Sequence, residues 1–135
     1  MNRFANMLLI AAALIPASAA CQVCVNQLAV PKYAPLAWAA QLTGSVDLTV
    51  TVGAQGRVIS VEGRGSSPIL VQRAKENVKG WVFCEPKSGG TSHVQLRYDY
   101  RLEGARVYHP PAAKVVLDLG EGTVEITMPP AEPQP

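Results

Sequence analysis

The most regular pattern in the chain is an alternation of apolar and polar residues. From residue 45 to residue 52, valine or leucine stands at every second position, and aspartate, threonine or serine stands between them. The same alternation recurs over residues 93–102. Because side chains two positions apart lie on one face of a strand, both stretches are predicted to be half-buried strands. Residues 57–62 follow a glycine-containing turn and are predicted to form the returning strand of a hairpin.

Two segments follow a helical pattern instead. A leucine, an alanine and a valine recur every four residues between positions 70 and 78, which places them along one stripe of a helix. Ser67 supplies an N-cap and Pro68 a first-position proline, so this helix is predicted to run from Pro68 to about residue 79. A shorter helix is predicted over residues 35–42, again with a proline in its first turn.

Two large aromatic residues follow the longer helix. Trp81 and Phe83 alternate in an extended segment, so both are expected to point to one side and fill the space between helix and sheet. Further on, residues 114–119 and 123–128 flank a glycine-rich turn, which predicts a second β-hairpin. The order of elements predicts an α+β fold: a small antiparallel sheet with a packed helix and an extra C-terminal hairpin.

The first twenty residues have a different character. Arg3 precedes a short apolar run that ends at Pro16, and small residues follow as far as Ala20, a pattern typical of a secretory signal peptide. A membrane-spanning helix needs about 20 apolar residues, so we expect cleavage rather than an uncleaved N-terminal anchor. The formal net charge of +2 is too small to indicate a nucleic-acid-binding protein.

Three cysteines leave an odd thiol in an exported protein. We predict a structural disulfide between Cys24 and Cys84, with Cys21 left over. Residues 18–21 resemble the lipobox of bacterial lipoproteins, although serine stands where leucine is usual, so Cys21 is a candidate for lipidation. In the alternative, Cys21 and Cys24 form a redox or metal-binding C-x-x-C motif. That alternative lacks the βαβ pattern of a thioredoxin and the four ligands of a zinc site.

Several short motifs together resemble the C-terminal domain of TonB, the periplasmic end of an energy transducer. Gly44 and Gly56 each stand two residues before a valine, as in the family pattern, and L-x-x-x-A-x-x-x-V-x-x-W-x-F is matched from residue 70 to Phe83. Tyr33 opens a segment close to the family's Y-P-x-x-A, with the proline one place late. The resemblance covers residues 33–102 and implies the same fold and a periplasmic location. It does not by itself transfer a function, because these are folding motifs.

This resemblance also divides the chain. We expect a signal peptide over residues 1–20, an irregular segment over 21–32, a TonB C-terminal-like domain over 33–103, a linker and hairpin over 104–128, and a proline-rich disordered tail over 129–135. A TonB energy transducer carries a membrane anchor and a long proline-rich arm before this domain. Here about twelve residues separate Cys21 from Tyr33, so we expect a stand-alone copy without the arm.

The resemblance implies a protein-binding role. Domains of this family pair a sheet edge with an extended peptide of an outer-membrane transporter, which is a form of strand addition. The candidate peptide-pairing strand is residues 93–102, whose outward face carries Arg97, Asp99 and Arg101. Two alternatives stay open for this strand: its charges can form a solvated face that prevents aggregation, or the C-terminal hairpin can pack beside it and block its edge.

The alternative function is an envelope lipoprotein or structural accessory domain, anchored through Cys21 and without a transport role. An enzyme is not expected, because no nucleophile stands beside a base and no metal-ligand cluster or phosphate-binding glycine loop is present in the sequence. We therefore predict no catalytic residue, no metal and no cofactor. The expected partner is a protein or peptide of the cell envelope, with no nucleic acid and with membrane contact only through an N-terminal lipid. The sequence does not decide between monomer and dimer.

Overall fold

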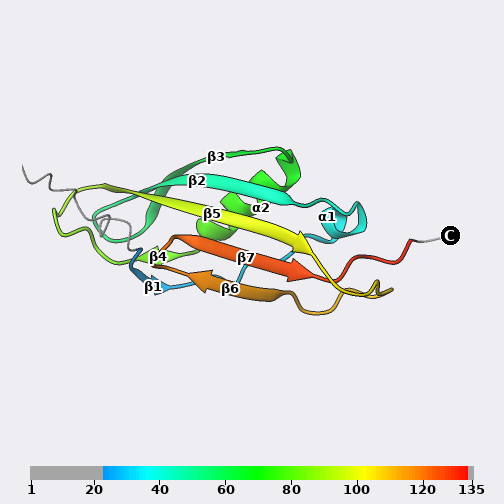
Figure 1. Ribbon diagram of the computed structural model, residues 1–135. Coiled ribbons are helices and arrows are strands. Elements are labelled where there is room, and N and C mark those ends of the chain that lie inside the picture. Colours follow the sequence, from blue (N-terminus) through cyan, green and yellow to red (C-terminus); the bar gives the residue numbers. More distant parts are fainter. Residues whose placement is uncertain (1–22, 134–135) are drawn as a thin grey trace, which may run out of the picture.

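The computed structural model describes residues 23–133, so the expected signal peptide and Cys21 lie outside the described residues. Figure 1 shows the helices and strands along the chain. They are β1 (Val25–Gln27), α1 (Pro35–Ala39), β2 (Gly44–Val52), β3 (Val58–Gly65), α2 (Pro68–Val78), β4 (Val82–Phe83), β5 (Ser92–Leu102), β6 (Lys114–Asp118) and β7 (Thr123–Met128). Within the described range, no helix is long and apolar enough to cross a membrane.

A five-stranded sheet in the order β3-β2-β5-β7-β6 carries the fold, and β1 forms a separate two-stranded sheet with β4. β2 pairs antiparallel with both β3 and β5, and β6 and β7 form the predicted antiparallel hairpin. The α+β class and the extra hairpin are therefore confirmed. The sheet is mixed rather than wholly antiparallel, because β7 runs parallel to β5. After β5 the chain crosses to the outermost position as β6, and β7 then returns between β6 and β5.

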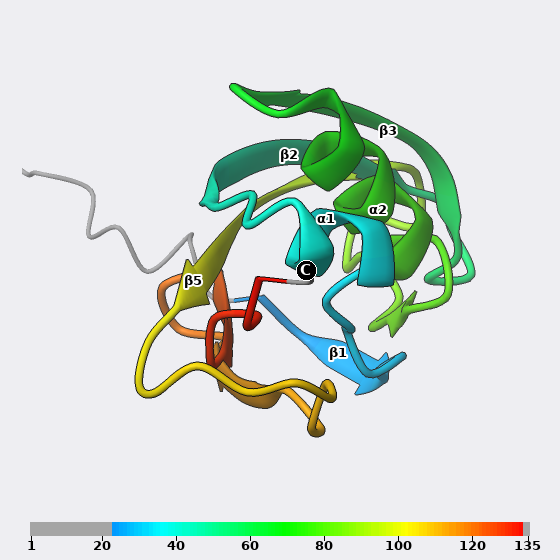
Figure 2. The same cartoon turned by 90° about the vertical axis from the view of Figure 1, so that its right-hand side faces the viewer.

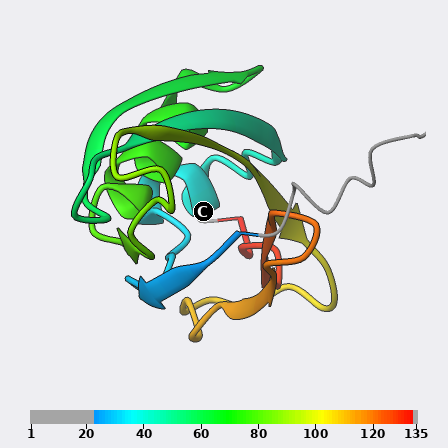
Figure 3. The same ribbon diagram turned by 90° about the vertical axis from the view of Figure 1, so that its left-hand side faces the viewer.

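The sheet curves around the helices. Figures 2 and 3 show α1, α2 and the C-terminal segment on its concave side. That side carries the apolar residues of the alternating strands, and the apolar stripe of α2 packs against them. Residues of 2 % exposure or less on β2, α2, β5 and β7 are Val46, Leu48, Val50, Val52, Leu70, Ala74, Val78, Tyr98, Tyr100, Val124 and Ile126. Trp81 and Phe83 are also buried, as predicted.

Local sequence accounts for the start of α2 and for one tight turn. The Ser67 hydroxyl accepts a hydrogen bond of 3.3 Å from the backbone N–H of Leu70, and a proline occupies the first turn, so the predicted cap is confirmed. Gly56 has a φ of +82°, and its carbonyl accepts a bond of 2.8 Å from the N–H of Phe83. A Cβ at Gly56 would lie 2.0 Å from the Phe83 carbonyl oxygen, so only glycine fits there.

The structure differs from the sequence-based expectation near both ends of the chain. β1 lies in the segment expected to be irregular, and it is held by pairing with β4. In the segment expected to be a disordered tail, the Pro129 carbonyl accepts a bond of 2.7 Å from the indole N–H of Trp38. Ala131 forms an isolated β-bridge with Val107 and is 7 % exposed. The proline-rich segment is therefore packed against the domain as far as the structure describes it.

Candidate functional site

The predicted peptide-pairing strand, β5, lies in the middle of the sheet. Its outward side chains contact the neighbouring strands. Arg97 Nε donates a hydrogen bond of 3.0 Å to Asp47 Oδ1 on β2, and this bond raises the pKa of the arginine. On the same strand, Asp99 Oδ1 accepts a bond of 2.5 Å from the Ser45 hydroxyl. Arg101 forms an ion pair of 3.5 Å with Glu125 on β7.

These contacts accompany main-chain pairing on both sides of β5. The stretch Arg97–Leu102 pairs with β7, and residues 92–100 pair with β2. Arg97, Asp99 and Arg101 therefore point outward, as predicted, but they do not lie on a free edge. This corrects the placement of the candidate site and confirms the alternative that the C-terminal hairpin packs beside the strand, because β7 uses the main-chain groups that a peptide would need.

β7 is a core element as well as a neighbour of β5. Val124 and Ile126 are fully buried, and Met128 is 4 % exposed. Exposing a buried side chain of this size costs about 1.5–3 kcal/mol, so removal of the strand would cost several times that amount. A short peptide would have to replace all three side chains to displace β7. The edge of β5 over Arg97–Leu102 is therefore closed by the fold itself.

The outer positions of the five-stranded sheet belong to β3 and β6. Each pairs with a described strand on one side only. On β3, the inward side of Gly63 and Gly65 lies against Val71 of α2, where a Cβ at either glycine would come within 3.0 Å of a valine methyl. On β6, Val116 points away from the core and is 45 % exposed. These two strands are the edge strands of the described sheet, and residues 92–96 of β5 also have no strand partner on the side that faces β7.

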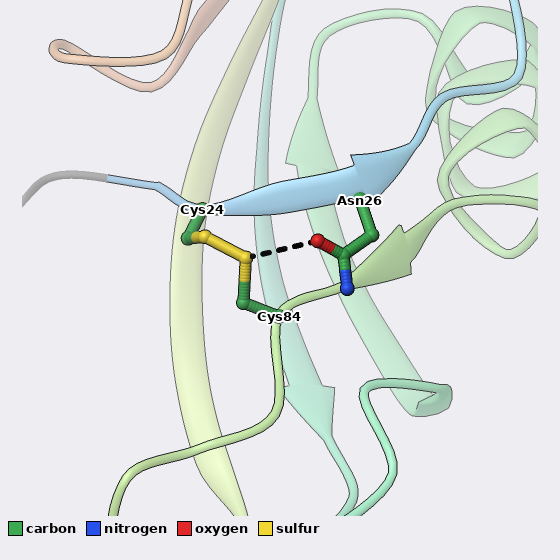
Figure 4. The surroundings of a disulfide bond; sticks show 3 residues. All are labelled: Cys24, Asn26 and Cys84. Carbon is green, nitrogen blue, oxygen red and sulfur yellow. Dashed lines mark hydrogen bonds between the residues drawn. A yellow bond between two sulfur atoms is a disulfide. The ribbon is translucent and has the colours of Figure 1, made fainter.

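A disulfide joins the start of the described chain to the segment after β4. Figure 4 shows Cys24 and Cys84 linked beside β1, with their Cα atoms 5.4 Å apart. The backbone N–H of Cys84 donates a bond of 3.0 Å to the Cys24 carbonyl, and Asn26 Oδ1 lies 3.5 Å from Cys84 Sγ. The disulfide therefore holds β1 against β4. Two strands of this length are too short to form a stable pair alone.

Burial in the core changes the pKa of three tyrosines. Burial raises the pKa of Tyr33 to about 12, and it also raises the pKa of Tyr98 and of Tyr100. All three tyrosines belong to the core, where a raised pKa keeps the hydroxyl neutral. Among residues 23–133, no three His, Cys, Asp or Glu side chains are grouped closely enough to hold a metal ion.

The fold defines a small α+β module in which Arg97, Asp99 and Arg101 form cross-strand pairs on the outward face of the sheet. The family model for the Gram-negative bacterial TonB protein C-terminal matches residues 29–102, more than half of the chain, and the chain belongs to this family. Domains of this family are periplasmic, non-enzymatic and related to transport. No curated protein and no solved structure matches the chain significantly.

The boundaries of the family match are informative. The match begins before α1 and ends at Leu102, the last residue of β5. It therefore includes the strands β2, β3 and β5 and the helix α2, and it excludes the hairpin β6–β7. The strand that closes β5 comes from outside the family segment, which is why the motifs of that segment did not reveal it.

Proposed function

We propose that this protein is a non-catalytic, protein-binding module of the periplasm. In this proposal, an outer strand of its sheet pairs with an extended segment of an envelope or outer-membrane transport protein. Membership of the TonB C-terminal family supports a transport-related role. Strand addition supplies affinity through main-chain hydrogen bonds and selectivity through alternate side chains.

One observation carries the proposal: β7 closes the central strand over Arg97–Leu102, while β3 and β6 each keep one side without a sheet partner among the described strands. An unpaired strand edge presents N–H and C=O groups to any extended chain that fits beside it. The partner is therefore expected at an outer strand and not at Arg97–Leu102.

Hydrogen exchange of the exported protein tests this proposal. The probes are synthetic peptides that copy the periplasm-facing segments of the organism's outer-membrane transporters. A binding peptide is expected to slow amide exchange in β3 or β6 and to leave β5 unchanged. A matched peptide with proline at alternate positions should not bind, because proline lacks the N–H that the edge requires. Protection in neither outer strand with any transporter segment would overturn the proposal.

A second candidate function is an envelope accessory domain anchored through Cys21, with no transport role. The observation that favours it is the closed edge of β5, because a chain that completes its own sheet needs no peptide there. Cys21 lies outside the described residues. Intact mass of the exported protein distinguishes the two: a species that begins at Cys21 and carries acyl chains supports the anchored form, and an unmodified mass excludes it.

A further inference from the structure

The chain exposes apolar side chains where it passes from β1 into α1. Leu28, Val30 and Leu36 are three of the six large apolar side chains that are exposed among residues 23–133. Val30 is 71 % exposed and Leu36 is 65 % exposed. Figure 2 shows this part of the chain beside α2. Exposed apolar side chains that gather in one region are typical of an interaction surface or a ligand groove.

This segment is fixed to the core at two points. The Ala29 carbonyl accepts a bond of 3.1 Å from the Asn77 amide and a bond of 3.2 Å from the indole N–H of Trp81. Tyr33 is buried, and its hydroxyl donates a hydrogen bond to the carbonyl of Leu42. Val30 lies between these two points, so its exposure is a property of the fold.

A groove lies on each side of the segment. The first, of about 480 Å³, opens between residues 29–35 and the second half of α2. The second, of about 370 Å³, opens between residues 30–33 and residues 110–113. Both volumes lie within the range of about 300–1,000 Å³ that is typical of ligand pockets, and both linings are mostly apolar. The residues that line both grooves, and so form a ridge between them, are Val30, Lys32 and Tyr33.

One positive charge on this ridge serves both grooves. Lys32 is the charged residue among those that line the second groove. In the first groove, Arg73 and Glu76 form an ion pair of 3.3 Å with each other, so their charges compensate. Lys32 forms no ion pair within residues 23–133. The ridge therefore offers one cation to a ligand whose apolar parts lie on either side of it.

We propose that this surface binds an anionic phospholipid with two acyl chains. One chain lies in each groove, and the phosphate group pairs with Lys32 on the ridge between them. A ligand with a single chain would leave one groove in water, and a head group without net charge would leave Lys32 uncompensated. Binding of this kind uses no main-chain pairing with a strand. The inference therefore goes beyond the proposed function and does not depend on it.

Two soluble short-chain lipids test the role of the charge. Dihexanoylphosphatidylglycerol is anionic, and dihexanoylphosphatidylcholine has the same chains but no net charge. Below the concentration at which either forms micelles, the exported protein is expected to bind the anionic lipid about fivefold more tightly at low salt, as one exposed ion pair allows. Lys32→Glu should remove this preference. Lys87→Glu, the same change of charge at an exposed position that lines neither groove, should keep it.

Amide NMR signals test the placement of the two chains. With the anionic lipid, signals of residues 29–35, of the second half of α2 and of residues 110–113 should shift together. Ala112→Trp places a large side chain at an exposed position of the second groove and should weaken binding by at least about tenfold. Ala54→Trp, in the exposed turn before β3, is the matched control and should have no effect.

Three results would overturn this inference: equal affinity for the two lipids, signal shifts confined to one groove, or no binding of either lipid below micelle formation. None of them bears on peptide pairing in β3 or β6, which the transporter segments test separately.

Discussion

The hydroxyl of Tyr98 donates a hydrogen bond of 2.6 Å to the side-chain Oδ1 of Asn77, and this bond joins β5 to α2. The same oxygen accepts a bond of 3.1 Å from the indole N–H of Trp81. The Asn77 amide in turn donates a bond of 3.1 Å to the carbonyl of Ala29. One side-chain amide therefore connects the helix α2, the central strand β5 and the N-terminal segment around Ala29. Tyr98 is fully buried, so its hydroxyl depends on this partner.

Asn77→Ala is predicted to destabilise the protein more than Tyr98→Phe. Loss of the tyrosine hydroxyl removes one hydrogen bond and should lower the free energy of unfolding by about 1 kcal/mol. Loss of the amide leaves a buried hydroxyl without its acceptor, which should cost about 1–3 kcal/mol. Urea unfolding measures both values. Tyr108→Phe, at a side chain that is 64 % exposed, should change nothing. Equal losses of unfolding free energy for Asn77→Ala and Tyr98→Phe would contradict the role of the Asn77 amide as the group that joins these elements.

Stability should fall as the pH rises above the ordinary tyrosine range. An unfolded tyrosine loses its proton near about pH 10, whereas burial raises the pKa of Tyr33 to about 12 and also raises that of Tyr98. Between these values the folded state binds more protons than the unfolded state. The free energy of unfolding therefore falls with pH, by about 1.4 kcal/mol per pH unit for each buried tyrosine.

Urea unfolding across this pH range, together with tyrosinate absorbance, checks the sign. Tyr33→Phe removes one titrating group and should make the decline less steep. A free energy of unfolding that stays constant from about pH 9 to about pH 12 would show that the core tyrosines are not protected from ionisation.

Removal of the disulfide should destabilise the protein without unfolding the five-stranded sheet. Cys24 and Cys84 are 60 residues apart in sequence, so their link restricts a long loop in the unfolded chain. The chain-entropy model gives a contribution of about 4 kcal/mol, less any strain in the folded state. The double variant Cys24→Ser, Cys84→Ser and the reduced native protein should show the same lowered thermal midpoint. Amide exchange should rise in β1 and β4 first, because those short strands depend on the link.

β7 should behave as a core strand. Ile126→Ala removes a fully buried side chain and is predicted to lower the free energy of unfolding by about 2–5 kcal/mol. Val116→Ala on the neighbouring strand β6, at a position that is 45 % exposed, should change it by less than about 0.5 kcal/mol. Denaturant unfolding of the two variants provides the comparison. A small effect of Ile126→Ala would indicate that the hairpin can leave the sheet, and it would reopen the edge of β5.

Patterns within single elements allowed much of the fold to be predicted. Alternation located β2 and β5, and the fourfold spacing with its serine cap located α2, because each signal depends on neighbours a few residues apart. β1 spans only Val25–Gln27, too short to show a period. The packing of the proline-rich end depends on Trp38, which donates to Pro129 across 91 positions of sequence. A contact between residues so far apart in sequence cannot be predicted from the pattern around either of them.

For the candidate site, too, local patterns predicted one part, and contacts between residues far apart in sequence decided the rest. The outward direction of Arg97, Asp99 and Arg101 followed from alternation. Packing of the C-terminal hairpin beside them was only one of two open alternatives, because it depends on the burial of Val124 and Ile126, far along the chain.

The parallel position of β7 also has a consequence for the order of folding. β7 lies inside the sheet but is built from residues 123–128, near the end of the chain. The sheet cannot be completed until those residues reach the compartment in which the protein folds, and non-local pairing of this kind is slow. During that interval the main-chain edge of β5 over Arg97–Leu102 has no partner on the side of β7. The chain is therefore most prone to aggregation before β7 joins the sheet.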